Sequence, residues 1–291
     1  MSSPRAKQLW WGPPGVGKTR KGLALPSVLV IDTEDGTQWY TDEFPNATIE
    51  RMVSWDDFFA RLRWLRTNPH QWGTLVIDGI TILKNDLDAK WIDTFMRRNQ
   101  TSKGFKQEYY TLQPAEYKPI GVEFDKMLRE LTMLDMNVII TARSKTAYEP
   151  GEIMKAIGHT FDGPKQLPYW ADTSLYLSRA KDGRFMAKIN AGDLSENPFK
   201  DRTGRFPCPQ EFEFTDDLLV NLFGEGITRV SVPTVLATAE QVEELKTLAV
   251  MIELDEKKIK RSLAEYGVDC YEDLTETSAI ALIGRMEKAK K

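Results

Sequence analysis

Cysteine, histidine and long apolar runs are all scarce in this 291-residue chain. The two cysteines, Cys208 and Cys270, lie far apart and outside any Cys-x-x-Cys spacing, and the histidines are His70 and His159. The sequence therefore predicts neither a disulfide framework nor a structural zinc site. No stretch approaches the roughly 20 consecutive apolar residues of a membrane span, and the N-terminus lacks an apolar run of signal-peptide length. We expect a cytoplasmic protein with no membrane partner.

Positive charge is not in excess either, because the formal net charge is -4. This balance argues against indiscriminate binding to nucleic acid, whose phosphates attract Lys and Arg. Any nucleic-acid partner would have to be held by local basic loops on an acidic body. The sequence also contains no internal repeat, which argues against a solenoid or propeller.

Short apolar, β-branched runs alternate with segments of helical periodicity. The apolar runs are KQLWWG, VLVID, TLVIDG and NVIITA, which begin at Lys7, Val28, Thr74 and Asn137. Such runs are typical of buried parallel strands. Between them, DDFFARLRWLRT, GITILKNDLDAKWIDTF and GVEFDKMLRELTML repeat apolar residues at three and four positions, as on one face of a helix. The alternation predicts an α/β fold around a mainly parallel sheet.

The pattern changes after Ala171. The segment DTSLYLSRAKDGRFMAKINA contains two β-rich runs around Asp182-Gly183. A hairpin is the expected structure, and it would add antiparallel strands at one edge of the sheet.

The last quarter of the chain reads as a separate helical module. Residues 226–238 carry glycines and a proline with weak periodicity, so we expect a linker there between a core at 1–225 and a module at 239–291. Thr238 with Gln241 forms a capping box before one helix, and Asp255 is placed to cap a second. A third helix from about Thr275 would complete a small three-helix module.

One motif near the N-terminus carries specific chemistry. The stretch GPPGVGKT fits the pattern G-x-x-x-x-G-K-[ST]. In this pattern glycines let backbone N–H groups curl around phosphate oxygens, the lysine reaches the β and γ phosphates, and the hydroxyl binds Mg²⁺. ATP is favoured over GTP because no Asn-Lys-x-Asp guanine signature is present, so we expect ATP and Mg²⁺ as cofactors. The candidate nucleotide-binding residues are Gly12, Pro13, Pro14, Gly15, Val16, Gly17, Lys18, Thr19 and Arg20.

A P-loop site also needs a carboxylate at the end of a second strand to hold the metal. Asp78 follows the buried run TLVI and is the candidate metal residue together with Thr19. The alternative is that Asp78 merely caps the helix that follows it. Many ring ATPases place a glutamate directly after this aspartate, whereas this chain has Gly79. The base that orients the attacking water must therefore come from elsewhere.

The segment VLVIDTEDG supplies three acids at the end of the strand after the P-loop helix. They are Asp32, Glu34 and Asp35, and that strand neighbours the P-loop strand in several topologies. We predict that Glu34 is the catalytic base. The alternatives are that Asp32 does this work or that the acids only solvate a turn.

Taken in order, GPPGVGKT, VLVIDTEDG, TLVIDGITIL and NVIITARSK resemble the core of RecA-type recombinases, and most of all small phage-encoded RecA-like ATPases that act as single-strand annealing proteins. The resemblance covers roughly residues 5 to 225. It implies a RecA-like P-loop NTPase core in which Glu34 activates water and Asp78 holds magnesium. It also implies a γ-phosphate sensor after NVIITA. Recombinases usually have an amide there, and the candidates here are Thr141, Arg143 and Ser144.

Two loops bind single-stranded DNA in this family, and basic residues occur at both places. The first stretch, FMRRNQTSKGFKQEYY, interleaves its cations with aromatic residues, which can stack on bases of any sequence. The second, SKTAYEPGEIMKAIGHTFDGPKQLPYW, is polar, and we expect a long loop. The alternative for both is a solvated charged loop. The candidate DNA-binding residues are Arg97, Arg98, Lys103, Lys106, Lys145, Lys155 and Lys165.

The segment NPFKDRTGRF follows the expected hairpin. In RecA-like and related hexameric ATPases, basic residues at this place reach the γ-phosphate of a neighbouring subunit, so the resemblance implies that Lys200 or Arg202 acts in trans. A basic turn without function is the alternative. If the functional interpretation holds, the ATP site is complete only in a homo-oligomer.

These observations predict a Mg-dependent ATPase that binds single-stranded DNA as a filament or ring and promotes annealing or strand pairing, encoded by a phage and working in a bacterial host. A single-strand-binding protein is a further candidate partner. The alternative is a nucleotide-dependent adaptor or loader that recruits a replication or repair protein.

Overall fold

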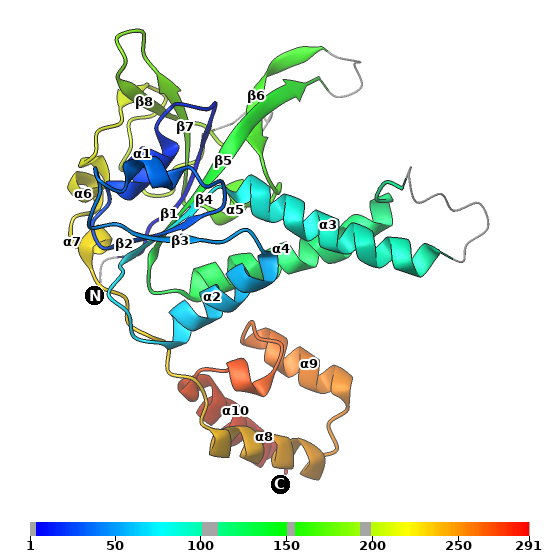
Figure 1. Ribbon diagram of the computed structural model, residues 1–291. Helices are drawn as coiled ribbons and strands as arrows, with labels where there is room; N and C mark the ends of the chain where they lie inside the picture. Colours follow the sequence, from blue (N-terminus) through cyan, green and yellow to red (C-terminus); the bar gives the residue numbers. More distant parts are fainter. Residues whose placement is uncertain (1–3, 101–109, 150–154, 193–198, 291) are drawn as a thin grey trace. The chain divides into compact units, whose positions relative to one another are not determined.

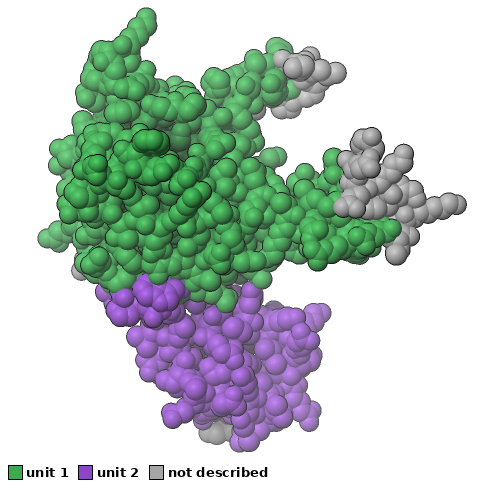
Figure 2. All heavy atoms as spheres, viewed as in Figure 1, with its two compact units in different colours: residues 1–63, 70–231 green, residues 64–69, 232–291 purple. Residues whose placement is uncertain are grey.

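The computed structural model describes residues 4–100, 110–149, 155–192 and 199–290. The chain forms two compact units, coloured separately in Figure 2. The first unit comprises residues 1–63 and 70–231, and the second comprises residues 64–69 and 232–291. The expected division into a core, a linker and a module at residues 225 and 238 stays a prediction.

The first unit is built on a nine-stranded sheet with the order β3-β2-β4-β5-β1-β7-β8-β9, and β6 pairs with β5 off this path (Figure 1). Strands β3, β2, β4, β5, β1 and β7 run parallel, whereas β6, β8 and β9 are antiparallel to their partners. This confirms the predicted α/β fold with a mainly parallel sheet and antiparallel additions. The strands are β1 (Lys7–Gly12), β2 (Val28–Asp32), β3 (Thr48–Arg51), β4 (Thr74–Asp78), β5 (Asn137–Tyr148), β6 (Ala156–Asp162), β7 (Thr173–Arg179), β8 (Phe185–Ile189) and β9 (Phe212–Glu213).

Helices connect and cover these strands. The long helices α2, α3 and α4 correspond to the three segments of helical periodicity, which confirms those predictions. Strands β2 and β4 are buried at every residue, as the continuous apolar runs indicated. The helices up to residue 231 are α1 (Lys18–Leu23), η1 (Thr37–Tyr40), α2 (Trp55–Thr67), α3 (Ile80–Asn99), η3 (Pro114–Glu116), α4 (Tyr117–Met133), α5 (Leu167–Trp170), α6 (Leu218–Phe223) and α7 (Glu225–Thr228), and the last four residues of α2 are assigned to the second unit.

The strand order corrects one expectation. Strand β2 is not a neighbour of the P-loop strand β1, because β4 and β5 lie between them. All four strands are parallel, so their carboxyl ends meet at one edge of the sheet. In open parallel sheets this edge is where ligands bind. Acids at the end of β2 can therefore approach the P-loop although the two strands do not touch.

The sheet has two antiparallel hairpins, of which the sequence predicted one. The hairpin around Asp182-Gly183 is present as β7 and β8, so that prediction is confirmed. The expectation of a long loop after NVIITAR is wrong, because β5 continues to Tyr148 and pairs with β6. Residues on both sides of Pro150-Gly151 suit a strand, and this dipeptide is a turn signal that a loop interpretation overlooks. Figure 1 shows β5 and β6 extending together beyond the rest of the sheet.

The second unit contains α8 (Ala239–Met251), α9 (Glu256–Glu265), η4 (Tyr271–Asp273) and α10 (Glu276–Ala289). Thr238 and Gln241 form the expected capping box, and the Asp255 side chain accepts the backbone N–H of Lys258 at 2.7 Å. Gly267 follows α9 with φ of 74°, a conformation that favours glycine. Among the described residues, no helix combines the length and apolar character that crossing a membrane requires.

Candidate nucleotide site

The P-loop joins β1 to α1 through a turn that depends on glycine. Gly15 and Gly17 have φ of 76° and 88°, in the left-handed region. A Cβ at Gly17 would lie 2.6 Å from the ring of Phe185, so any larger residue would collide with β8. Val16 points the other way and is buried in the hydrophobic core. The loop is thus anchored beneath by one apolar side chain while its backbone faces the cavity described below.

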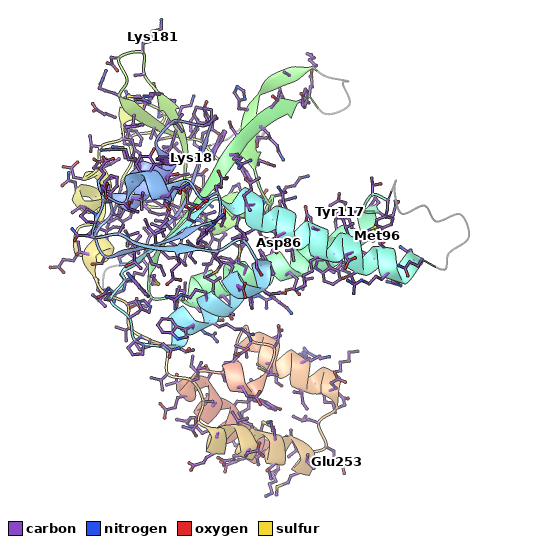
Figure 3. The ribbon with its side chains drawn as sticks, viewed as in Figure 1. Lys18, Asp86, Met96, Tyr117, Lys181 and Glu253 are labelled. Atoms are coloured by element: carbon purple, nitrogen blue, oxygen red, sulfur yellow. The ribbon has the colours of Figure 1, made fainter. Side chains whose placement is uncertain are left out.

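Lys18 lies at the base of this loop, at the first position of α1 (Figure 3). Its Nζ donates to the carbonyl oxygens of Gly12 and Pro13 at 2.9 and 2.8 Å. Burial lowers the pKa of the Lys18 ammonium from its usual value, and the carboxylates of Asp78 and Glu34 oppose that shift. A desolvated ammonium attracts an incoming phosphate more strongly than a solvated one does.

Asp78, at the end of β4, is held by hydroxyl groups from two other elements. The Oγ1 atoms of Thr19 and Thr141 donate to its two carboxylate oxygens, each at 2.6 Å. The residue is only 5% exposed, and burial raises the pKa of its carboxyl above the ordinary value, while the two hydrogen bonds oppose the shift. The N-cap of α3 is Gly79. Both oxygens of Asp78 thus engage hydroxyl groups, an arrangement that does not favour the capping alternative.

These ligands suit magnesium. Mg²⁺ prefers oxygen and binds proteins through one or two carboxylates, substrate phosphates and retained waters. Among the described residues, no group of three or more His, Cys, Asp or Glu side chains is placed to hold a metal alone. Thr19 and Asp78 therefore fit an ion shared with phosphates. Thr19 and Asp78 would hold the Mg²⁺, which would supply positive charge against the charge that develops on the phosphates.

Asp32 is the last residue of β2 and Glu34 lies in the turn after it, and the two differ in what they contact. Asp32 is 1% exposed. Its carboxylate accepts three backbone N–H groups at 2.8–2.9 Å and one hydroxyl at 2.6 Å, from Glu34, Asp35 and Thr37. Every one of these bonds shapes the turn that follows β2. Asp32 therefore has a structural task, which favours Glu34 as the catalytic base.

The Glu34 carboxylate lies beside Gly79. A Cβ placed at Gly79 would lie 2.9 Å from Glu34 Oε1 and 3.4 Å from Thr141 Oγ1. The two turns are tied together, because the Gly79 N–H donates to Thr33 Oγ1 at 2.8 Å and the Thr33 N–H donates to the carbonyl of Asp78 at 2.7 Å. The carboxylate of Glu34, from the turn after β2, thus lies where a side chain after Asp78 would begin. A side chain at position 79 would require the Glu34 carboxylate to move.

Arg143, on β5, is the partner of Glu34. Its Nε donates to Glu34 Oε1 at 3.0 Å, and the two side chains are 53% and 33% exposed. The hydrogen bond to Glu34 is the main reason that the pKa of Arg143 is raised. Of the three sensor candidates, Thr141 and Arg143 line the cavity, while Ser144 is absent from its lining. The guanidinium is placed to exchange a carboxylate for a phosphate oxygen.

Together these residues enclose a cavity of about 190 Å³. It brings the P-loop, the end of β2, Asp78 and the middle of β5 to one place, and it includes Tyr40 and Ala142, which sequence reasoning missed. Arg20 also lines it, although its guanidinium pairs with Glu43 and Asp216. The lining residues are Pro14, Gly15, Gly17, Lys18, Thr19, Arg20, Glu34, Tyr40, Asp78, Thr141, Ala142 and Arg143.

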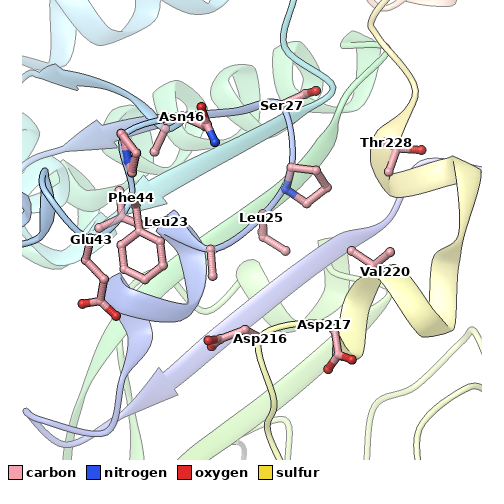
Figure 4. A pocket seen from close by; sticks show the side chains of 14 residues that line it. Leu23, Leu25, Ser27, Glu43, Phe44, Asn46, Asp216, Asp217, Val220 and Thr228 are labelled. Carbon is pink, nitrogen blue, oxygen red and sulfur yellow. The ribbon is translucent and has the colours of Figure 1, made fainter.

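A second, larger hollow of about 450 Å³ lies beyond the C-terminal end of α1 (Figure 4). Leu25, Phe44 and Val220 give it apolar walls, and Glu43 and Asp216 stand at its side. None of the predicted site residues lines it. The larger hollow is therefore not the place where the P-loop chemistry assembles.

The predicted DNA-binding residues that the structure describes do not line the cavity. Arg97 and Arg98 are exposed at the end of α3, and Arg97 pairs with Asp93. Lys103 and Lys106 lie outside the described residues. On the β5–β6 hairpin, Lys145 pairs with Asp162 at 3.1 Å, and Lys155, beside β6, pairs with Glu149. Lys165 is exposed in the turn before α5.

Lys200 and Arg202 lie near the amino ends of β1 and β7. The P-loop follows the carboxyl end of β1, so the two cations are at the opposite end of the strands. The carbonyl of Lys200 accepts the N–H of Ser174 at 3.0 Å, and Arg202 pairs loosely with Asp172 at 3.8 Å. Asp172 itself contacts the first residue of β1, Lys7. One copy of the chain therefore does not bring these two cations to its own nucleotide cavity.

Comparison with known proteins agrees with the geometry of this cavity. The AAA domain family matches residues 5–203, about two thirds of the chain. No curated protein matches the sequence, so the narrower resemblance to phage-encoded annealing proteins stays a prediction. A family match of this extent spans the P-loop, the carboxylates and β5. The chain belongs to the AAA domain family and is an AAA-type P-loop ATPase.

Proposed function

We propose that this protein is a Mg-dependent ATPase that binds single-stranded DNA as a homo-oligomer and promotes annealing or strand pairing. The observation that carries the proposal is the course of β5. The strand places Thr141 and Arg143 in the nucleotide cavity and continues into the exposed β5–β6 hairpin with Lys145. A nucleotide-dependent change at Arg143 can thus be passed along one strand to a basic surface.

In this proposal, hydrolysis depends on separate tasks for the residues of the cavity. Lys18 binds the β and γ phosphates, and Thr19 and Asp78 hold the metal. Glu34 orients the attacking water, and the hydrogen bond from Arg143 at 3.0 Å holds its carboxylate in position. When a γ-phosphate enters, Arg143 is the cation that can turn to it, and Glu34 is then free to accept a proton.

DNA binding would use the hairpin and the end of α3. Residues from Lys155 to His159 are exposed along β6, and Tyr148 on the paired strand is 48% exposed. Exposed cations follow phosphates, and exposed aromatic faces stack on bases whatever their sequence. The ion pairs of Lys145 and Lys155 are at the surface and contribute little stability, so phosphate oxygens can replace the carboxylates.

Steady-state ATP hydrolysis by the full chain, with and without single-stranded DNA and at two salt concentrations, tests the proposal. We expect DNA to stimulate turnover, and the stimulation to fade as salt rises, because phosphate contacts release counterions. Lys145→Ala should weaken the stimulation. Lys260→Ala, which also removes one exposed lysine from an ion pair, is the matched control and should leave it unchanged.

One observation favours the alternative of an adaptor. The second unit exposes Val250 and Met251 near the end of α8 and Ile280 on α10, with exposed fractions of 78%, 55% and 56%. Exposed apolar side chains mark contacts with other proteins where they form a contiguous patch. Hydrolysis that is indifferent to DNA at both salt concentrations would contradict the DNA-binding proposal and support an adaptor that recruits its partner through the second unit.

A further inference from the structure

Two cations lie on one face of β5 where this strand leaves the buried sheet. Arg143 and Lys145 are separated by one residue, and side chains at positions i and i+2 of a strand point to the same face. Arg143 lines the nucleotide cavity and donates to Glu34. Lys145 lies one step further along the exposed β5–β6 hairpin. Neighbouring side chains of one strand thus belong to the nucleotide cavity and to the basic surface of the hairpin.

One carboxylate lies within reach of both cations. Asp162, the last residue of β6, pairs directly opposite Arg143. Residues opposite each other in an antiparallel pair have Cβ atoms about 4.5–5.5 Å apart, and long side chains also reach their diagonal neighbours. Lys145 is such a diagonal neighbour, and its Nζ donates to Asp162 Oδ1 at 3.1 Å. Asp162 is therefore placed to accept either cation.

The charge of Asp162 already acts on Arg143. The hydrogen bond to Glu34 is the main reason that the pKa of Arg143 is raised, and the negative charges of Glu34 and Asp162 add to the increase. Among the described residues, the guanidinium of Arg143 forms an ion pair with Glu34 alone. The carboxylate of Asp162 likewise pairs with Lys145 alone in the part of the chain that is described. All four side chains are at least one-third exposed, so each pair contributes little free energy and its partners can be exchanged.

The backbone of Asp162 is fixed although its side chain is not. Its carbonyl oxygen accepts the Oγ1 hydroxyl of Thr81 at 2.7 Å. Thr81 is only 3% exposed and belongs to the first turn of α3, which follows the metal residue Asp78. The carboxylate of Asp162 can therefore change partners without displacement of the strand that carries it.

We infer that Asp162 couples DNA binding to ATP hydrolysis by exchanging Lys145 for Arg143. The inference rests on the proposed DNA-stimulated ATPase and names the residue that regulates it. A DNA phosphate that binds Lys145 leaves the Asp162 carboxylate without a cation. Asp162 then draws Arg143 away from Glu34, which is released to orient the attacking water. Because a guanidinium has five N–H donors, Arg143 can contact Asp162 and a γ-phosphate together.

Steady-state ATP turnover by Asp162→Asn, with and without single-stranded DNA, tests this exchange. An amide has no charge to draw Arg143 away, so we expect most of the DNA stimulation to be lost. Affinity for a fluorescent single-stranded oligonucleotide should be retained or increased, because Lys145 no longer has a competing acid. Glu149→Gln removes the acid of another ion pair on the same hairpin and is the matched control, which should keep the stimulation.

Two outcomes of this experiment would overturn the inference. The first is stimulation of Asp162→Asn by DNA as strong as that of wild type. The second is a loss of DNA affinity together with the stimulation, which would mean that Asp162 only supports the hairpin.

Lys145→Ala provides a test that needs no DNA. It leaves Asp162 without its cation, so turnover in the absence of DNA should rise by about two- to fivefold, the size that a half-exposed ion pair allows. Addition of Asp162→Asn to Lys145→Ala should abolish the rise. Lys155→Ala, which frees Glu149 instead, is the control and should show no rise. DNA-free turnover of Lys145→Ala equal to that of wild type would contradict the exchange, and this variant also keeps the inference testable if Asp162→Asn does not fold.

The two experiments separate this inference from the proposed function. Equal DNA stimulation of wild type and Asp162→Asn would refute the exchange and leave the proposed function standing. Wild-type turnover that is indifferent to DNA, together with a rise in Lys145→Ala that depends on Asp162, would support the exchange of ion pairs and refute the proposed function.

Discussion

The sheet of the first unit has a first edge, formed by the carboxyl ends of the parallel strands, and a second edge, formed by their amino ends. The two edges differ in how their charged side chains are used. At the carboxyl ends of the parallel strands, Lys18, Asp78 and Glu34 converge on one cavity, and Asp78 accepts two short hydrogen bonds. At the other edge, Lys200 is partly buried, and Arg202 is exposed and pairs loosely with Asp172. The first edge is organised for chemistry within one copy. The second edge carries cations that contact no nucleotide cavity in their own copy. Such cations are available to act on the nucleotide cavity of a neighbouring copy.

The largest effect is expected at the first edge. Glu34→Gln should lower the rate of ATP hydrolysis by about 10²- to 10⁴-fold, the usual contribution of a general base. Affinity for a fluorescent ATP analogue should be retained, because Lys18 and Thr19 are untouched. Asp35→Asn, in the same turn but paired with Arg51, is the control and should retain its turnover. Normal hydrolysis by Glu34→Gln would assign the base to another residue.

The second edge should matter for catalysis without touching nucleotide affinity. Replacing Lys200 and Arg202 together by Ala should cost about 10³-fold in turnover, at the lower end of values for cations supplied in trans. Arg285→Ala, which breaks a surface ion pair in the second unit, should change nothing. Normal ATP turnover by the double variant would show that the second edge takes no part in the reaction. The proposed division of tasks between the two edges would then be wrong.

The burial of Asp78 should cost stability that depends on pH. Its folded-state pKa is raised, so its favourable contribution is complete below the pKa of the unfolded chain and is lost as pH rises through the folded-state value. Asp78→Asn should therefore raise the melting temperature of the nucleotide-free protein at neutral pH, with a difference that shrinks on acidification. Calorimetry between about pH 4 and pH 8 covers this range. An Asp78→Asn variant that is less stable at neutral pH would contradict this account.

The smallest effect is expected outside the first unit. Thr238→Ala removes the N-cap of α8 and should cost about 1 kcal/mol of the free energy of unfolding of the second unit. Thr238→Ser keeps an oxygen for the Gln241 N–H and should be nearly neutral. Urea denaturation measures both. ATP turnover should be unaffected, and a change in turnover would mean that the two units share the chemistry.

The parts of the fold that could be predicted are those with local signals. The P-loop has fixed spacing, β2 and β4 are uninterrupted apolar runs, and the caps at Thr238 and Asp255 follow from side-chain chemistry alone. The β5–β6 hairpin was missed because β6 is exposed over most of its length and buries only Phe161, so no apolar alternation marks it. Strand β9, with two residues, is too short to leave any pattern.

The site could be predicted as a list of residues but not as contacts. The choice of Asp32 or Glu34 as the catalytic base depends on which carboxylate accepts the backbone N–H groups of the turn. The sequence alone allows either carboxylate to do so. The fit of Glu34 beside Gly79 joins residues from different strands, and the bond from Thr141 to Asp78 depends on β5 lying beside β4. Both partners of each contact could be identified in the sequence, but the sequence did not show that they lie close together.

The central claim is that one ATP site uses both edges, and subunit mixing tests it most directly. The measurement is ATP turnover of an equimolar mixture of Glu34→Gln protein with the Lys200→Ala, Arg202→Ala double variant, both nearly inactive alone. Where an intact Glu34 faces an intact Lys200 and Arg202, activity should return, to about a quarter of wild type for random head-to-tail assembly. Turnover no higher than the mean of the two separate variants would contradict the claim.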